Sequence, residues 1–368
     1  MCPLLLKKNK KIFVCPLDWG LGHATRCIPI IEKLKSRGIE VFIGADKGPY
    51  ALLKKCFPDV RMVRFPGYEI QYPENGRMAL KILRSLPYLL ERIKLEHREL
   101  LKLHEKYQFN ALISDNRFGL FHADIPCIYL THQVMIKAAR GFSFLEPLMH
   151  RMHKHYIMKF DECWIPDLAG IDNLSGDLGH RFEPGTKTRF IGPLSRFSSK
   201  DHESGQAAKT RLRLLIIISG PEPQRSIFEK IILEQLQNAT IKAVVVLGLP
   251  GHDIHYPLND SVDIHAHLDT EKMKELIKGA DNIVCRPGYT SIMDLYALNK
   301  RAWLVATPGQ TEQEYLASYM LGKEFPGQSQ DKFDINEIMA AGPLPGWHHD
   351  RIDTSMLDMA VDDLIQRI

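Results

Sequence analysis

The sequence lacks the features of a secreted protein and of a protein with membrane-spanning helices. Its seven cysteines include no Cys-x-x-Cys pair and are odd in number, which argues against a zinc site and against a complete disulfide framework. No apolar stretch approaches the roughly 20 residues that cross a bilayer. The opening apolar residues precede the basic run of residues 7–11, the reverse of the order in a signal peptide. We therefore expect a cytoplasmic protein.

A large excess of charge of one sign is also missing. The 368 residues hold 48 Lys and Arg against 44 Asp and Glu, a formal net charge of +4, which is too small to indicate nucleic-acid binding. Residues 77–106 contain eight Lys or Arg and four Glu, a local difference of +4. This segment has two interpretations. It is either a solvated helix that covers a sheet, or a docking surface that holds the protein at the inner face of an anionic membrane.

The sequence does contain a regular alternation of short apolar runs with helical patterns. In the first half we expect strands at residues 11–15, 40–44, 60–65, 111–114, 127–130 and 162–165. In the second half we expect strands at residues 213–219, 243–247, 282–285 and 302–306. Helical segments separate most of them, which is typical of parallel sheets covered by helices.

The chain divides into two units of this kind. Residues 197–206 are polar and hold few large apolar groups, as in a linker. The predicted fold class is therefore α/β, with two Rossmann-like, doubly wound domains that face a cleft. We expect an N-terminal domain over residues 1–197, a C-terminal domain over residues 207–350 and a closing helix over residues 351–368.

The first expected strand runs into a glycine loop. Gly20 and Gly22 allow a close approach of the backbone, and His23 stands where a helix should begin. Ligands of parallel sheets collect beyond the carboxyl ends of the strands, where helix N-termini present unpaired N–H groups. This loop is therefore either part of a ligand site or a tight turn whose histidine caps the helix.

The first strand of the second half leads into a similar loop. Ser219, Gly220 and Arg225 supply a hydroxyl, a glycine and a cation around an expected helix start. The same residues also fit a turn that is stiffened by its prolines and has a solvated arginine.

A third loop follows the strand at residues 282–285. Gly288 ends the strand, Thr290 and Ser291 offer hydroxyl and amide donors at a helix start, and Asp294 follows one turn later. This pattern suits a pyrophosphate, with the carboxylate accepting hydrogen bonds from ribose. The alternative is an N-cap by Thr290 or Ser291, with Asp294 favourable to the helix dipole.

Taken together and in this order, the loops resemble the inverting nucleotide-sugar glycosyltransferases of family twenty-eight, which include the peptidoglycan N-acetylglucosaminyltransferases. The resemblance spans about residues 11–325 and is most specific over residues 286–291 and 308–317. It implies the GT-B architecture, with the donor bound mainly by the C-terminal domain. The sequence departs from the family where Asp294 replaces the usual Glu and where Gly220-Pro-Glu-Pro replaces a second glycine loop.

The resemblance also implies roles for individual residues. The glycine and hydroxyl turn binds the diphosphate, Asp294 binds ribose, the pair Glu312 and Gln313 contacts the sugar, and uracil packs beside a segment that ends at Leu268. Gly20, Gly22 and His23 match the acceptor-side loop of the family. The complete donor-binding set expected here is Ser219, Gly220, Arg225, Leu268, Arg286, Gly288, Thr290, Ser291, Asp294, Glu312 and Gln313.

The implied reaction is a direct displacement at the anomeric carbon of a UDP-sugar, which serves as substrate and not as a cofactor. His23 is the candidate base, because histidine titrates near neutrality, and Asp18 is the reserve base or the residue that orients His23. Arg225, Arg286 and helix N-termini would stabilise the departing UDP without a metal. The sequence therefore predicts transfer of a hexose or N-acetylhexosamine to a carbohydrate or lipid-linked hydroxyl, for example in a cell-envelope glycan.

Two other functions fit the same loops. A UDP-sugar 2-epimerase shares the architecture but needs further carboxylates near the sugar, and the sequence identifies none. A nucleotide-sugar-binding protein without turnover would keep Gly288, Thr290 and Asp294 but would tolerate the loss of His23.

Overall fold

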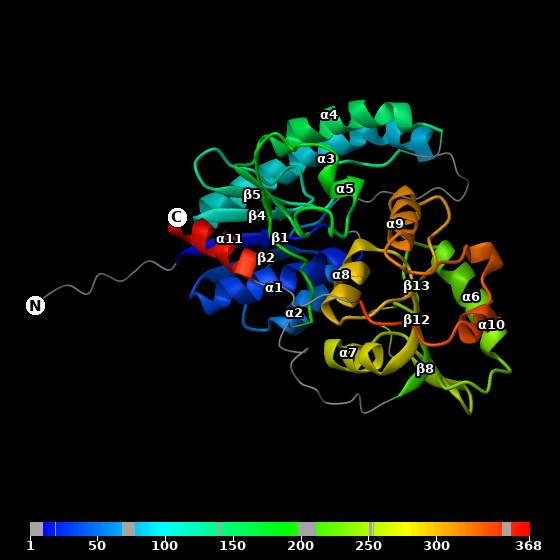
Figure 1. The fold of residues 1–368 in the computed structure, drawn as a ribbon. Helices are drawn as coiled ribbons and strands as arrows, with labels where there is room; N and C mark the ends of the chain where they lie inside the picture. Colours follow the sequence, from blue (N-terminus) through cyan, green and yellow to red (C-terminus); the bar gives the residue numbers. More distant parts are fainter. Residues whose placement is uncertain are drawn as a thin grey trace, which may run out of the picture.

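The computed structural model describes residues 10–18, 20–67, 78–138, 141–197, 211–249, 252, 254–347 and 355–368, with the backbone alone at residues 78–86 and 145. These residues form two α/β units, each built on its own sheet (Figure 1). The linker residues 198–206 and the start of the closing segment, residues 351–354, lie outside the described part.

The first sheet has seven parallel strands in the order β3-β2-β1-β4-β5-β6-β7. The strands are β1 (Lys11–Cys15), β2 (Glu40–Ala45), β3 (Arg61–Arg64), β4 (Ala111–Asp115), β5 (Cys127–Leu130), β6 (Glu162–Ile165) and β7 (Lys187–Phe190). The sequence predicts six of these strands and misses β7. That edge strand has only four residues, and its side chains are exposed or partly exposed, so it lacks the buried apolar run that marks its neighbours.

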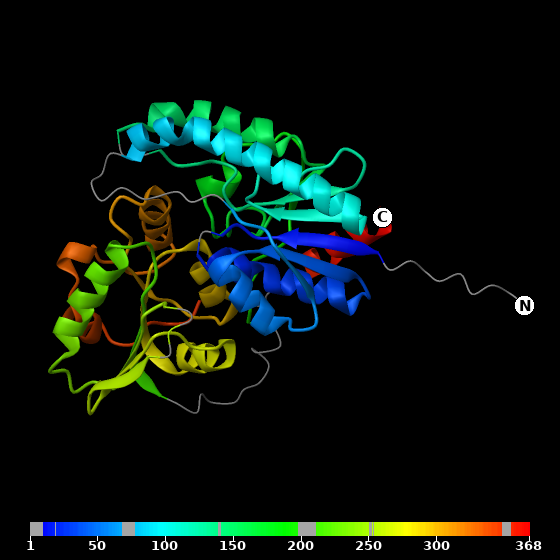
Figure 2. The same cartoon turned by 180° about the vertical axis from the view of Figure 1, so that it is seen from behind.

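Helices cover both faces of this sheet. They are α1 (Gly22–Ser36), α2 (Lys47–Cys56), α3 (Met78–Tyr107), the 3-10 turn η1 (Ser143–Leu145), α4 (Glu146–Ile157) and α5 (Asp177–His180). Helices α1 and α2 lie on one face, and α3 and α4 lie on the other (Figures 1 and 2). Side chains of β1 alternate between the two layers: Ile12 and Val14 pack in the cluster that includes α1, whereas Phe13 packs with Leu100 of α3.

The second sheet has the order β10-β11-β9-β8-β12-β13, with β10 antiparallel to β11 and the other pairs parallel. Its strands are β8 (Leu212–Ile217), β9 (Ala243–Val246), β10 (His255–Asn259), β11 (Val262–His265), β12 (Ala280–Cys285) and β13 (Trp303–Leu304). Its helices are α6 (Gln224–Leu236), α7 (Thr270–Gly279), α8 (Tyr289–Ala297), α9 (Thr311–Leu321), the 3-10 turn η3 (Gln330–Lys332) and α10 (Ile335–Ala340). The hairpin of β10 and β11 is not predicted by the sequence, because β10 is polar and largely exposed.

The last helix, α11 (Ser355–Gln366), returns to the first unit and lies beside α1 (red in Figure 1). Lys33 of α1 and Arg37, which follows the helix, each place a nitrogen 2.7 Å from a carboxylate oxygen of Asp358. The opposite side of α11 buries the apolar residues Leu357, Ala360, Val361 and Leu364. The C-terminal end of the chain therefore belongs in space to the domain that the N-terminal half builds.

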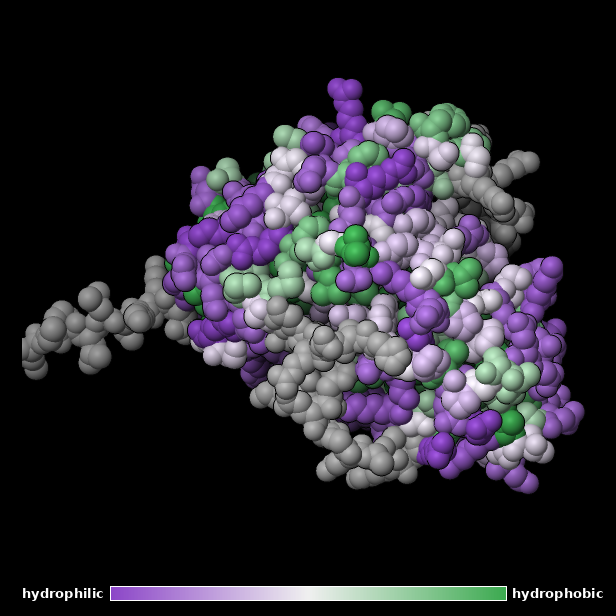
Figure 3. Space-filling model, in the orientation of Figure 1, coloured by the Kyte–Doolittle hydropathy of each residue, from purple (hydrophilic) through white to green (hydrophobic). Residues whose placement is uncertain are grey.

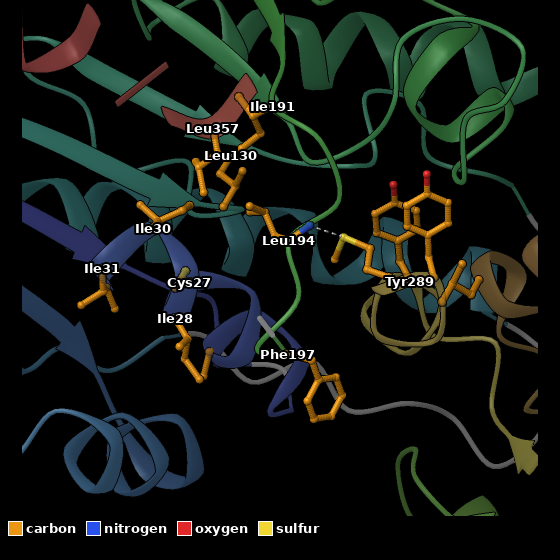
Figure 4. Close-up of a cluster of buried hydrophobic side chains, with 14 of the residues drawn as sticks. Cys27, Ile28, Ile30, Ile31, Leu130, Ile191, Leu194, Phe197, Tyr289 and Leu357 are labelled. Carbon is orange, nitrogen blue, oxygen red and sulfur yellow. Dashed lines mark hydrogen bonds between the residues drawn. The ribbon is translucent and has the colours of Figure 1, made fainter. Parts of the chain in front are cut away.

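One apolar cluster continues across the boundary between the two units. Figure 4 shows Cys27 and Ile28 of α1, Leu194 and Phe197 of the crossing segment, and Tyr289 of α8 within this cluster. The backbone N–H of Leu194 also donates to the sulfur of a methionine on α8 at 3.2 Å. The two domains thus share a packed core at the base of the crevice, which fixes how their strand ends face one another.

Candidate active site

Each sheet has one point where the strand order reverses, and the candidate residues cluster at these two points. In the first sheet the reversal lies between β1 and β4, and in the second it lies between β8 and β12. Loops at the carboxyl ends of such strands splay apart and leave a crevice for ligands. The glycine loop before His23 follows β1, whereas Gly288 follows β12.

The first turns of α1 and α8 meet across the domain boundary. The hydroxyl of Thr290 donates to the carbonyl oxygen of Gly22 at 3.3 Å. A Cβ atom on Gly22 would lie 2.9 Å from that hydroxyl oxygen, so only glycine permits this approach. Unpaired N–H groups of two helix N-termini therefore meet in one region, which favours an anion there.

His23, in the first turn of α1, is held by a carboxylate that the sequence analysis did not identify. Its Nδ1 lies 3.0 Å from Oδ1 of Asp115, the last residue of β4. Arg26, one turn further along α1, donates from Nε to Oδ2 of Asp115 at 2.8 Å and from Nη2 to Oδ1. All three groups come together because β1 and β4 are neighbours at the reversal of the first sheet.

The charge of Asp115 fixes the tautomer of His23. Burial alone would raise the pKa of Asp115, but Arg26, followed by His23, outweighs burial and holds that pKa well below its usual range. Asp115 is therefore a carboxylate, which can only accept hydrogen bonds. His23 consequently donates through Nδ1–H, so in the neutral tautomer Nε2 is the nitrogen that can take a proton.

Asp18 does not orient His23, which corrects one expectation from the sequence. Its Oδ2 accepts from the backbone N–H of Gly67 at 2.7 Å, and its Oδ1 lies 3.5 Å from Nη1 of the buried Arg117. Burial raises the pKa of Asp18, while Arg117 opposes this shift. Asp18 therefore anchors the chain after β3, and Asp115 makes the contact with His23. The sequence did contain a signal, since Asp115 directly follows an expected strand next to the first one.

Both expected arginines already have partners within the second domain, an arrangement that does not favour the expected contact with a diphosphate. Arg225 pairs with Glu222 and Glu229, each at 2.6 Å. Arg286 is buried and donates to the carbonyl oxygens of residues 305 and 306 at 3.0 and 3.1 Å. Burial lowers the pKa of Arg286 to about 10. Both guanidinium groups support the loops of the second sheet from within.

The loop after β8 approaches the chain that follows β13. Gly220 has a positive φ of 110°, and a Cβ there would lie 3.3 Å from the hydroxyl oxygen of Thr307. This hydroxyl is buried and makes no hydrogen bond within the part of the chain that the structure describes. Gln313 fixes the same loop, because its Oε1 accepts from the backbone N–H of Thr307 at 2.9 Å. Thr307 is thus a candidate donor-site residue that the sequence analysis missed, and Ser219 precedes Gly220 at this edge.

The turn after β12 begins α8 without a side-chain cap. Gly288 occupies the N-cap position, so neither Thr290 nor Ser291 has the capping role that the sequence allowed. Asp294 accepts from the hydroxyl of Ser195 at 2.6 Å and lies 3.4 Å from Nε of Arg196. Its carboxylate therefore fastens the segment that crosses between the domains, an arrangement that does not favour the expected ribose contact.

Two further expected residues have different surroundings. Glu312, in the first turn of α9, places Oε1 2.9 Å from Nε2 of His132 in the other domain. Leu268 is buried in the core, so its side chain does not offer the expected surface for uracil. Among the described residues, no group of three His, Cys, Asp or Glu side chains is arranged to hold a metal ion. The described helices also include none that is long and apolar enough to cross a membrane.

Comparisons with known proteins follow the same architecture. No protein-family model matches the chain. An uncharacterized glycosyltransferase of Methanosarcina acetivorans is 22% identical over 330 residues, which cover 84% of this chain and 80% of that protein.

Solved structures match over both domains. The calicheamicin glycosyltransferase CalG4 has a TM-score of 0.60 at 11% identity, covering 98% of this chain and 94% of that one. Arabidopsis thaliana UGT89C1 complexed with UDP-L-rhamnose gives 0.57 at 11% identity, with 98% and 94% covered. MurG of Acinetobacter baumannii gives 0.51 at 13% identity, with 98% and 100% covered. This chain has the GT-B glycosyltransferase fold. The predicted fold class is confirmed.

The buried pair of Asp115 and Arg26 gives a prediction on stability. Asp115→Asn leaves the Arg26 guanidinium buried without a counter-charge, so the free energy of unfolding should fall by about 3–5 kcal/mol at pH 7. The folded-state pKa of Asp115 lies below its unfolded value, so its contribution is present above the unfolded value and is lost as the pH falls through the folded one. The measurement is urea unfolding of the Asp115→Asn variant and of the unchanged chain. The difference between their free energies of unfolding should become smaller below about pH 4.

The matched control is Asp59→Asn, which removes an exposed ion pair with Lys35. This variant should change the free energy of unfolding by less than about 1 kcal/mol. Equal stability of the Asp115→Asn variant and the unchanged chain at pH 7 would contradict the structural role given to Asp115.

Proposed function

We propose that this protein is an inverting glycosyltransferase that moves a hexose or N-acetylhexosamine from a UDP-sugar to a hydroxyl acceptor. The observation that carries the proposal is the pairing of His23 with Asp115 beside the first turn of α8. This pairing supports a base beside two helix N-termini, and transfer from a nucleotide sugar uses both kinds of group.

The chemistry follows from the tautomer of His23. Nε2 of His23 takes the proton of the acceptor hydroxyl while that oxygen attacks the anomeric carbon. The bond from the anomeric carbon to the UDP oxygen breaks on the opposite face, so the configuration inverts and the bonding electrons leave with UDP. Asp115 stabilises the imidazolium that forms, as a buried carboxylate does in other acid–base sites.

Donor binding is assigned to the second domain. The diphosphate would meet Gly288, Thr290 and Ser291, where N–H groups and hydroxyls begin α8, and the loop of Ser219 and Gly220 with the hydroxyl of Thr307 lies at the neighbouring edge. Glu312 and Gln313 begin α9 and are assigned to the sugar. Helix N-termini meet the charge of the leaving group in this scheme, so no metal or cofactor is required.

The acceptor is proposed to be a carbohydrate or a lipid-linked glycan of the cell envelope, met at the inner face of the membrane. The resemblance to family twenty-eight supports this choice, although the structural likeness extends equally to the glycosyltransferases of kitacinnamycin and calicheamicin and to Arabidopsis thaliana UGT89C1. Nothing in the comparisons supports the epimerase alternative. A nucleotide-sugar-binding protein without turnover would not need the contact of His23 with Asp115.

A membrane contact is better supported at α4 than at the basic segment of residues 77–106. Arg77 lies outside the described residues, and on the described part of α3 the exposed Lys and Arg residues alternate with exposed Glu91, Glu99 and Glu105. By contrast, η1 and α4 expose Phe144 at 72% and Leu148 at 58%. Figure 3 shows hydrophobic side chains at the upper edge of the molecule, where Figure 1 shows α4.

The charge around this apolar edge suits an anionic lipid surface. Residues 141–159 contain a single carboxylate, Glu146, which is buried and paired with Arg181. Arg151 and Lys159 are exposed on the same segment. Exposed aromatic and aliphatic side chains beside cations are typical of helices that lie in a membrane interface.

The first test concerns the base. His23→Ala should lower the transfer rate by about 10² to 10⁴ and remove the acidic limb of the pH–rate profile, because the base that takes the proton of the acceptor hydroxyl is gone. UDP affinity should change little. Rates are normalised to folded protein, and His122→Ala, a histidine outside the crevice, serves as control. A fall below about tenfold would assign the base to another group.

The second test concerns metal. Transfer should proceed at an unchanged rate in EDTA, because helix N-termini already stabilise the diphosphate charge. The measurement is UDP release with acceptor present, before and after chelation. Activity that disappears with EDTA and returns with Mn²⁺ would overturn the metal-free mechanism.

The third test concerns the membrane. The double variant Phe144→Ser, Leu148→Ser should bind vesicles rich in phosphatidylglycerol at least about tenfold more weakly than the unchanged chain, since it loses two inserting apolar groups. Leu321→Ser is the matched control, because Leu321 is 64% exposed on α9 in the other domain. Vesicle binding that is equal for the double variant and the control would exclude α4 as the contact.

A further inference from the structure

His132 links the two domains at the crevice and has no role in the mechanism described so far. It follows β5 by two residues and is buried. Its ring stacks on Tyr289 of α8, with ring centroids 4.2 Å apart and an interplanar angle of 1°. Its two nitrogens contact Arg26 of its own domain and Glu312 of the other domain, each at 2.9 Å.

The partners of His132 determine which of its nitrogens carries the proton. A guanidinium can only donate, so Nδ1 of His132 accepts from Nη1 of Arg26. The ring proton is therefore on Nε2, which donates to Oε1 of Glu312. Burial lowers the pKa of His132, an effect that its hydrogen bond to Glu312 opposes and the nearby Arg26 reinforces. The neutral ring thus keeps this directed hydrogen bond at neutral pH.

The opposite oxygen of Glu312 remains available. The Glu312 side chain is 27% exposed, and its Oε2 makes no hydrogen bond within the described part of the chain. One oxygen is therefore fixed from across the domain boundary, while the other faces away from that contact. A carboxylate held in this way is an oriented acceptor for a neutral hydroxyl donor.

We infer that His132 is a positioning residue for the donor sugar. Its Nε2–H holds Glu312 so that Oε2 accepts from a hydroxyl of the transferred sugar, and Arg26 fixes the ring of His132 relative to Asp115. Because His132 and Glu312 belong to different domains, the sugar is recognised in full only when the domains are closed as they are here. This inference rests on the proposed function and adds a residue of the first domain to donor recognition.

The inference predicts different effects on the affinity for the UDP-sugar and on the affinity for UDP. Loss of the hydrogen bond should weaken binding of the UDP-sugar but not of UDP, since UDP lacks the transferred sugar whose hydroxyl would meet Glu312. A purely structural histidine would affect both ligands equally or neither. The ratio of the two affinities is therefore the decisive quantity.

Three variants of the full chain provide the test. His132→Phe keeps a ring to stack on Tyr289 but loses both hydrogen bonds. His132→Gln keeps an amide N–H near the position of Nε2. His180→Phe is the matched control, because His180 also donates to a carboxylate, Asp167 at 3.1 Å, and stacks on an aromatic ring, but within one domain.

We expect His132→Phe to raise the KM for the UDP-sugar by about 10- to 100-fold, as for the loss of a hydrogen bond to a charged group, with a smaller change in kcat. UDP affinity from calorimetry should stay within about threefold of the unchanged chain for all three variants. His132→Gln should have a KM close to that of the unchanged chain, and His180→Phe should have the same KM as the unchanged chain.

A double-mutant cycle tests whether His132 acts through Glu312. In the background of Glu312→Ala, His132→Gln and His132→Phe should no longer differ in KM, because the group that His132 orients is gone. Independent effects of the two positions, or equal loss of UDP and UDP-sugar affinity in His132→Phe, would overturn the inference. An unchanged chain that neither binds nor transfers from any nucleotide sugar would instead overturn the proposed function.

Discussion

The ion pair of Arg26 and Asp115 organises the crevice. It brings a cation from α1 and an anion from β4 out of water, and such a pair is stable only when its remaining hydrogen bonds are satisfied. Here Asp115 also accepts from His23, and Arg26 also donates to His132. A single buried pair thereby sets the tautomers of two histidines, one in the first turn of α1 and one reaching the other domain. The chemistry proposed for the crevice depends on this charge arrangement more than on any single loop.

Sequence patterns anticipated the parts of the fold that depend on local periodicity. Apolar runs such as residues 11–15 and 111–115 indicate central strands, because a central strand of a covered sheet is buried on both of its faces. The edge strands β7 and β10 were missed, because their exposed side chains resemble those of loops. The boundary near residue 200 stays a prediction from composition, since a linker needs no core.

The site was less predictable, since its contacts depend on which strands become neighbours. His23 and Gly288 were visible as residues at strand ends, but the partner of His23 came from a strand about ninety positions away. The sequence also does not show whether an arginine side chain points into a ligand site or into the interior of its own domain. Arg286 looked like a phosphate ligand but lies inside the second domain, where it donates to carbonyl oxygens. His132 gave no signal because its function depends on Glu312, which approaches only after both domains have formed.

The return of α11 to the first domain changes the mechanical connection between the two halves. The chain crosses from one domain to the other between β7 and β8 and crosses back between α10 and α11. A domain joined by a single connection can rotate in any direction. A domain joined by two connections is restricted to rotation about the line between the two attachment points. Two connections therefore limit the orientations that the second domain can take, and such a limit favours the arrangement in which Glu312 lies opposite His132.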